Sequence, residues 1–404
     1  MTTNDTLELD WIVCVDWGVG LAKRRAWVST LEDRSVCELH GGPWTVARLF
    51  EAARHLKGRG ILSIDAVLGI PNDYLRRWRD SSPTRHSVAG FTSWLSCAHA
   101  TPGFYTSAPN AGAWSVDRPF IAVPGGEGAL SAFWQVTGGR LLRQIEKQTG
   151  AKSAFIVSGI PGTVGSGTRA LWSELAPLLA QRRDGNDFGI WPFEGRLPKL
   201  LARHKIVLGE IYPRVCYALG LDAVLPAPLR ILAKTDAATR STATLCLLSS
   251  EWVRRENVQI RVADPATIDE DNFDAMISAA GLLRCVLEGR ALERAGTDGV
   301  EGDILGLAAL TFGQAGSSGQ PLGFGGAMDR PTSAPRTPRQ GDSSLSAELP
   351  RFPCPIPGCV KVFSGTRGGW DAHVGAIRKH PRWHPELGAS EARKNAFRTE
   401  FPRW

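Results

Sequence analysis

The most constraining feature of the sequence is the order of apolar runs within its first 65 residues. Three strand-like runs, at residues 11–17, 25–30 and 35–40, follow one another with short links, and short links favour an antiparallel meander. Residues 44–56 then carry apolar side chains at helical spacing, and residues 60–65 form a further apolar run. Because a helix permits a parallel crossover to the fourth strand, this order predicts a mixed α/β sheet.

The pattern continues along a body that we expect to span residues 8–312 as one α/β domain. The later elements predicted from periodicity are a strand at 154–158, a helix at 168–183 interrupted at Pro177, a strand at 205–212, and helices at 237–256 and 272–290. Residues 84–135 are rich in Gly, Ser, Pro and aromatic residues and show weak periodicity, so we expect an irregular insertion there.

Composition and charge change after residue 312. Residues 313–350 are dominated by Gly, Ser, Pro and Gln, which is typical of a flexible linker. The net charge of the chain is +7, and residues 329–404 contain 13 Lys and Arg against 7 Asp and Glu. A nearly neutral body followed by a basic module at residues 351–404 fits either a polyanion-binding appendage or a solubilising tail.

Carboxylates stand at the ends of the apolar runs. Asp16 ends IVCVD, Asp65 ends LSID and Glu210 ends VLGE. Asp271 and Asp274 lie three residues apart at the start of a predicted helix, which places them on one helical face. A carboxylate in an apolar strand is costly unless it is paired, hydrogen-bonded or bound to a metal. The pattern therefore predicts an oxygen-rich site suited to Mg²⁺ or Mn²⁺.

These aspartates also have structural explanations. Asp16 is followed by a Trp-Gly pair and could form a turn, and Asp65 could cap the next turn. Asp271 is as well suited to be a helix N-cap as a ligand, and the helix dipole favours an anion at Asp274 in the first turn. Asp274 is the stronger candidate ligand because it directly precedes the apolar stripe that must face the core.

Basic residues offer partners for these acids. Glu210 could pair with Arg214 or Lys205, which lie near it in the sequence. Lys234 and Arg240 could contact a phosphate, but we interpret them as solvated charges of a helix.

Six segments of the body, taken together, resemble a known family. In chain order they are VDWG, SIDAVLGIP, WPFEG, GEIYPR, DNFDAMISAA and EGDILG. This ordered set, over roughly residues 11–310, resembles the predicted nuclease family catalogued as domain of unknown function 429, whose members are assigned to the ribonuclease H-like fold. The resemblance implies that Asp16 and Asp65 are metal ligands on neighbouring parallel strands. It also implies that Asp274 is the ligand of the C-terminal helix, and it matches Glu210 to the family's glutamate.

The implied activity is hydrolysis of phosphodiester bonds by a carboxylate-bound metal centre. Two divalent ions about 4 Å apart can activate a water and stabilise the leaving oxygen. In this scheme Asp16 holds both ions, Asp65 and Asp274 complete the site, with Asp271 as a further candidate ligand, and Glu210 assists. The alternative is a protein of the same fold that binds nucleic acid or a protein partner without catalysing a reaction.

The segment DWGVGLAK also permits a different interpretation. Sugar kinases and actin-like ATPases have a related fold and begin with an Asp-Gly loop, in which the backbone at Gly18 and Gly20 would face ATP with Lys23 nearby. Such proteins need a second domain with its own phosphate loop. The Gly-rich segments at 124–128 and 162–167 do not follow a strand that ends in Asp, so we prefer the nuclease hypothesis.

The basic module contains a zinc-ligand pattern. Four residues separate Cys354 from Cys359, thirteen separate Cys359 from His373, and six separate His373 from His380. Two thiolates and two imidazoles suit tetrahedral Zn²⁺, and the segment resembles a Cys-Cys-His-His zinc finger. Because the histidine spacing is longer than the usual three to five residues, His384 is an alternative fourth ligand.

Partners and location follow from the charge and from the apolar runs. Nucleic acid is the expected partner, DNA or RNA, because basic residues surround the zinc-ligand pattern. They are Lys361, Arg367, Arg378, Lys379 and Arg382. Zinc fingers also bind proteins, so a protein partner is the alternative. No apolar run approaches the ~20 residues that span a bilayer, and the first residues lack a secretory pattern; we expect a cytoplasmic protein with no membrane partner.

Overall fold

The computed structural model divides into two compact units, Met1–Asp329 and Arg330–Trp404. The residues that it describes are 7–123, 130–158, 163–182, 188–221, 234–296, 298–310, 351–353, 362–364, 396 and 399–400. The linker predicted at 313–350 lies outside them. In the second unit, strands β10 (Arg351–Pro353) and β11 (Val362–Ser364) pair antiparallel.

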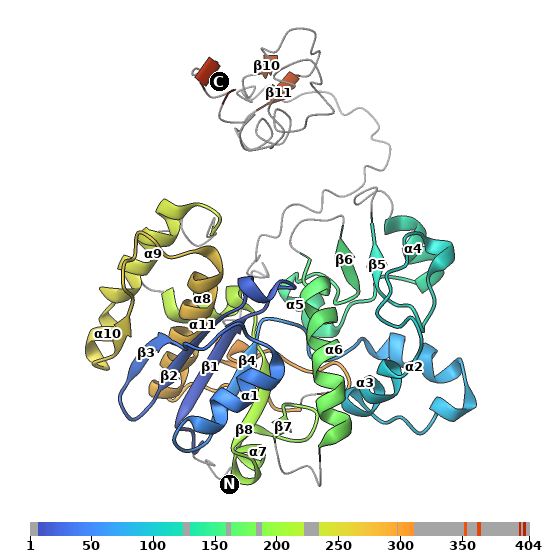
Figure 1. Cartoon of the computed structure of the whole chain (residues 1–404), viewed down its shortest axis with the longest axis horizontal. Helices are drawn as coiled ribbons and strands as arrows, with labels where there is room; N and C mark the ends of the chain where they lie inside the picture. The colour runs from blue at the N-terminus through green and yellow to red at the C-terminus, as the bar shows by residue number, and fades with distance from the viewer. Residues whose placement is uncertain are drawn as a thin grey trace, which may run out of the picture. The chain divides into compact units, whose positions relative to one another are not determined.

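A seven-stranded mixed sheet forms the centre of the first unit (Figure 1). Its strand order is β7-β8-β4-β1-β2-β3-β9. Its strands are β1 (Trp11–Asp16), β2 (Arg25–Thr30), β3 (Ser35–Glu38), β4 (Gly60–Ile64), β7 (Gly189–Ile190), β8 (Ile206–Glu210) and β9 (Gln259–Arg261). Strands β1, β2 and β3 form an antiparallel meander. Strand β4 runs parallel to β1, and β8 runs parallel to β4. The predicted mixed α/β sheet is confirmed.

Helices surround this sheet. They are α1 (Val46–His55), α2 (Asn72–Asp80), α3 (Phe91–His99), α4 (Leu130–Thr137), α5 (Gln144–Thr149), α6 (Gly165–Gln181), α7 (Leu197–Arg203), α8 (Pro213–Leu221), α9 (Ala237–Leu248), α10 (Glu251–Arg255) and α11 (Glu270–Leu287). Short 3₁₀ turns lie at Leu21–Lys23, Pro83–Arg85, Ala111–Ala113 and Leu307–Ala309. Helix α1 packs against β4 and β8, whereas α11 packs against β1, β2 and β3.

The central strands β1, β4 and β8 are mostly apolar because both faces of the sheet are buried. In β1, Val13 and Val15 enter the core that contains the buried side of α1. Ile12 and Cys14 enter the opposite core, together with α8 and α11. Successive side chains of a strand point to opposite faces of the sheet. A strand that is covered by helices on both faces therefore has a nearly continuous apolar sequence.

Three details differ from the prediction. The insertion at 84–135 is not wholly irregular, because α3 buries Phe91 and Trp94 among other aromatic rings. Helix α6 continues through Pro177, since the burial of residues on the same helix, such as Trp172, offsets the lost hydrogen bond. The helix predicted at 237–256 is two helices, and Ser250 caps the second by accepting a hydrogen bond from the backbone N–H of Val253.

The insertion also contributes one strand of a second, two-stranded sheet. Strand β5 (Ile121–Ala122) pairs in parallel with β6 (Ile156–Ser158). Ile121, Phe133 and Ile156 form part of a separate apolar cluster there. In the part of the chain that the structure describes, no helix is both long enough and apolar enough to cross a membrane.

Candidate functional site

Asp16 and Asp65 leave the sheet side by side. Val15 and Ile64 are partners in the parallel pairing of β1 with β4. The backbone N–H of Asp65 donates to the carbonyl oxygen of Val15 at 2.9 Å. The two aspartates are the next residues along these neighbouring strands, so the parallel register places both at one edge of the sheet.

The pKa values of these two carboxyl groups show that a third acid lies near them. Burial and, after it, the negative charges of Asp65 and Asp274 raise the pKa of Asp16 to about 9. Burial and, after it, the charge of Asp274 likewise raise the pKa of Asp65 to about 7. Helix α11, which packs against β1, therefore brings Asp274 to the same edge as the two strand-end aspartates.

Asp16 and Asp65 are partly exposed to solvent. Within the described ranges, neither carboxylate takes part in a side-chain hydrogen bond or an ion pair. Like charges that lie close together disfavour each other's ionised form. The strand ends therefore present two carboxylates that have no side-chain partner among the described residues and whose ionised form needs added positive charge.

Asp274, in contrast, is buried and already has partners. Its side chain is 1% exposed. The hydroxyl of Tyr217 donates to Oδ1, and the ammonium of Lys234 donates to Oδ2. Burial raises the pKa of Asp274, whereas the charge of Lys234 and these hydrogen bonds lower it. Burial alone lowers the pKa of Lys234, but the charge of Asp274 raises it above its ordinary value, so Lys234 carries a positive charge beside Asp274.

The sequence-based interpretation of Lys234 and Arg240 as solvated helix charges is wrong. Lys234 precedes Asp236, which is the N-cap of α9, and its ammonium enters the acidic cluster. Arg240 donates to the backbone carbonyls of Ile268 and of Lys234 at 2.9 and 2.6 Å. No local pattern marks Lys234 or Tyr217 as a partner of Asp274, because the chain brings them there from 40 and 57 residues away.

Asp271 lies in the first turn of α11 and is partly exposed. It is not the N-cap, so that explanation is wrong. The N-cap is Asp269, whose Oδ1 accepts a hydrogen bond from the backbone N–H of Asn272 at 2.7 Å. The charge of Asp271 contributes to the raised pKa of Asp16, although less than those of Asp65 and Asp274. Asp271 therefore lies at the margin of the cluster.

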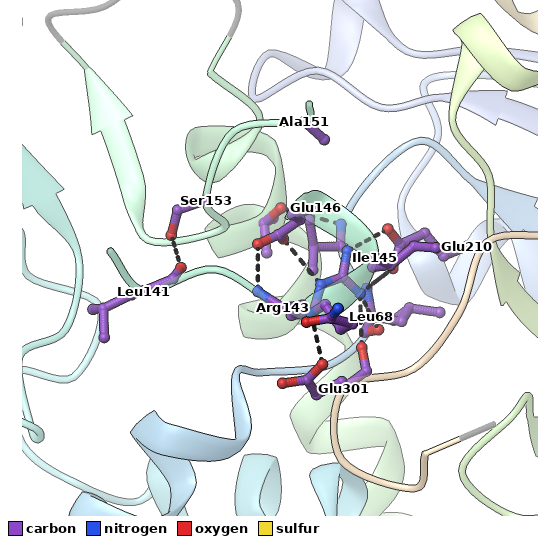
Figure 2. Close-up of polar contacts among 12 residues, drawn as sticks. Leu68, Leu141, Arg143, Ile145, Glu146, Ala151, Ser153, Glu210 and Glu301 are labelled. Carbon is purple, nitrogen blue, oxygen red and sulfur yellow. Dashed lines mark hydrogen bonds and ion pairs between the residues drawn. The ribbon is translucent and has the colours of Figure 1, made fainter. Parts of the chain in front are cut away.

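Glu210 has a different environment (Figure 2). It ends β8, where it is the parallel partner of Ile64. Both of its oxygens bind the guanidinium of Arg143, with Nη2 at 2.6 Å from Oε1 and Nη1 at 2.8 Å from Oε2. The backbone N–H of Leu68 also donates to Oε2, at 2.7 Å. The partners suggested by the sequence, Arg214 and Lys205, are wrong. Glu210 is bound to protein groups, whereas Asp16 has no side-chain partner among the described residues.

Arg143 connects three segments around Glu210. Its side chain is 1% exposed. Its Nε donates to Oε1 of Glu146 at 2.9 Å. Its Nη1 also donates to the carbonyl oxygens of Leu68 and Glu301, at 2.9 and 3.0 Å (Figure 2). Leu68 belongs to the segment that begins with Asp65, so this buried network holds that segment against β8.

The residues at the strand ends fit a divalent cation in their donor type. Mg²⁺ binds oxygen ligands, commonly one or two carboxylates, and keeps several waters. Asp16 and Asp65 provide two such carboxylates. Among the described residues no group of three or more His, Cys, Asp or Glu side chains is arranged to hold a metal ion. Here the third acid, Asp274, is held by Lys234 and Tyr217.

A cavity of about 350 Å³ lies at the opposite edge of the sheet, where β4 and β8 begin. It is lined by Gly58, Arg59, Ala202, Arg203, His204 and Lys205. Arg59 donates to the carbonyl of Leu201 at 2.7 Å, and Lys205 donates to that of Arg54 at 2.8 Å. These cations bind carbonyls in the last turns of α7 and α1, which is a common role at helix ends. The cavity is separate from the carboxylates.

The predicted zinc ligands cannot be placed. Cys354, Cys359, His373 and His380 lie outside the described residues, as does His384. Comparisons of the chain with protein-family models, curated proteins and solved structures find no match. The fold and the chemistry of the carboxylate cluster are therefore the grounds on which a function is proposed.

Proposed function

We propose that the first unit is a divalent-metal-dependent nuclease with a ribonuclease H-like fold. The order of elements supports this fold, since three antiparallel strands are followed by α1 and by β4, which lies parallel to β1. The observation that carries the activity is the convergence of Asp16, Asp65 and Asp274 at one edge of the sheet, where the charges of Asp65 and Asp274 raise the pKa of Asp16 and the charge of Asp274 raises that of Asp65.

In this proposal Asp16 and Asp65 hold Mg²⁺ or Mn²⁺ through their carboxylate oxygens, which have no side-chain partner among the described residues. The bound ion would supply an activated water and stabilise negative charge on the phosphodiester. Without a cation, the carboxyl of Asp16 keeps its proton at neutral pH, because its pKa is about 9. Arg143 and Glu210 keep the segment after Asp65 in place through Leu68.

The second unit supplies nucleic-acid binding in this proposal. Residues 329–404 carry most of the net positive charge of the chain. Zn²⁺ is held by Cys354, Cys359 and His373, with His380 or His384 as the fourth ligand. Positive charge near a zinc finger favours phosphate contacts, and one finger reads only about 3 base pairs, so the module delivers the body to nucleic acid without strong sequence selection.

One observation favours a second candidate function, a protein of the same fold that binds nucleic acid without cleaving it. Lys234 donates to Asp274, so its ammonium already supplies a positive charge at the place where a metal ion would supply one. Under this hypothesis the protein binds nucleic acid equally well with and without a divalent cation.

A cleavage assay distinguishes the two. The full chain is incubated with labelled single- and double-stranded DNA and RNA in Mn²⁺, in Mg²⁺ or in EDTA. The nuclease hypothesis predicts products in the presence of metal, and a loss of at least about 100-fold in rate for Asp16→Asn, since removing a group that stabilises the transition state costs about 10²–10³. Asp73→Asn, at an exposed aspartate paired with Arg76, is the matched control. Undiminished cleavage by Asp16→Asn would refute the assignment.

A further inference from the structure

Lys234 is the cation of the acidic cluster. Its ammonium contacts Oδ2 of Asp274 and lies 3.3 Å from Oε1 of Glu270. Its position does not depend on the side chain alone, since Arg240 donates to the carbonyl oxygen of Lys234 at 2.6 Å and also to that of Ile268, just before α11. The backbone of Lys234 is thereby tied to the start of the helix that carries Asp274.

A positive charge is needed at this place. Asp274 is 1% exposed, and an ionised carboxylate so deeply buried is destabilising unless a cation or several donors compensate for it. Tyr217 donates one hydrogen bond, to Oδ1, and Oδ2 depends on Lys234. In the absence of a metal, the ammonium is therefore the group that balances the charge of Asp274.

The two ion pairs near the sheet edge differ in how firmly they are held. Arg143 is 1% exposed and binds both oxygens of Glu210, so this pair is enclosed by protein. The side chain of Lys234 is 38% exposed and binds a single oxygen of Asp274. A lysine is a compact charge on a flexible stem, and it can move toward solvent without leaving a void in the core.

We propose that Lys234 is an exchangeable counter-ion, which a divalent cation displaces from Asp274. This proposal rests on the proposed metal-dependent function. A cation that is held by Asp16 and Asp65 takes Oδ2 of Asp274 as a further ligand. The released ammonium then lies at the rim of the site, where it binds a phosphate of the nucleic-acid substrate. Lys234 thus links metal binding to substrate binding.

The first test measures the binding of Mn²⁺ to the full chain by isothermal titration calorimetry. Lys234→Met removes the competing charge, and we expect its affinity for Mn²⁺ at the carboxylate site to be at least about tenfold higher than that of the wild type. Lys57→Met is the matched control, because Lys57 is ion-paired with Glu32 at an exposed site, and its affinity should not change. Equal, weaker or undetectable binding by Lys234→Met would overturn the proposal.

The second test uses the wild-type protein, so it does not depend on the folding of a variant. The acetylation rate of each lysine is followed by peptide mass spectrometry, with and without Mg²⁺. Release from Asp274 should increase the rate at Lys234 several-fold at saturating Mg²⁺ and leave Lys57 unchanged. An unchanged rate at Lys234 would contradict the exchange.

These results separate the two proposals. If Lys234→Met binds Mn²⁺ more tightly and the wild type cleaves no nucleic acid, the counter-ion role stands and the nuclease hypothesis fails. If cleavage depends on metal but Lys234→Met binds Mn²⁺ no more tightly than the wild type, the nuclease hypothesis stands and the counter-ion role fails.

Discussion

Replacing Arg143 by Met should destabilise the first unit strongly. Methionine fills much of the same space but leaves Glu146 and Glu210, both about 1–4% exposed, without their cation. The substitution also removes the donors to the carbonyl oxygens of Leu68 and Glu301. Removing one partner of a buried ion pair costs about 3–5 kcal/mol, and two carboxylates lose their partner here, so we expect a loss of at least about 4 kcal/mol.

This loss is large compared with the about 5–15 kcal/mol that stabilises a typical domain. It is measured at pH 7 by urea denaturation, followed by tryptophan fluorescence and circular dichroism. Arg76→Met is the control, because Arg76 and Asp73 form an exposed pair three residues apart on α2. An exposed pair of this kind contributes about 0–1 kcal/mol, so the control should be close to the wild type.

The dependence on pH gives a second check of the same reasoning. Burial raises the pKa of Glu146 to about 7 and also raises that of Glu210, although Arg143 lowers both. Without Arg143 both pKa values rise further above those of the unfolded chain. A group with a raised pKa in the folded state loses its stabilising contribution as the pH rises. The difference in free energy of unfolding between the wild type and Arg143→Met should therefore be smaller at pH 5 than at pH 8. If Arg143→Met lowers the free energy of unfolding at pH 7 by less than about 1 kcal/mol, as expected for an exposed pair, that result refutes the argument.

Three further predictions concern the cluster, the helix packing and the second unit. Burial and then neighbouring acids raise the pKa of Asp16 from its ordinary 3.8 to about 9. The metal-free wild type should therefore lose stability as the pH rises through this range. Measured in EDTA over the same pH range, the melting temperature of Asp16→Asn should fall less than that of the wild type. A Cβ at Gly281 would lie 2.6 Å from the carbonyl oxygen of Cys216, so Gly281→Ala should lower the free energy of unfolding, measured by urea denaturation, by about 1–3 kcal/mol. A Cβ at Gly20 would meet no atom within 4 Å, so Gly20→Ala should lower it far less. Elemental analysis of the purified chain should find one zinc per molecule, and Cys354→Ser should lose it.

Much of the sheet could be predicted because its signal is local. Strand β2 matches its predicted range of 25–30, and β1 and β4 each end one residue before theirs. The alternation of side chains along a strand, and the 3.6-residue period of a helix, are properties of the backbone and need no distant partner. The carboxylates at the strand ends are visible for the same reason, since a polar residue that ends an apolar run is a local feature.

What the carboxylates bind was decided by the tertiary structure. Glu210 pairs with Arg143 from 67 residues away, and Asp274 pairs with Lys234 from 40 residues away. The sequence alone offered Arg214 and Lys205 for Glu210, because it shows only near neighbours. Coulomb energy depends on distance in space and on burial, and neither is written in the order of residues. The positions of the acids are therefore a property of the sequence, whereas their charge balance is a property of the fold.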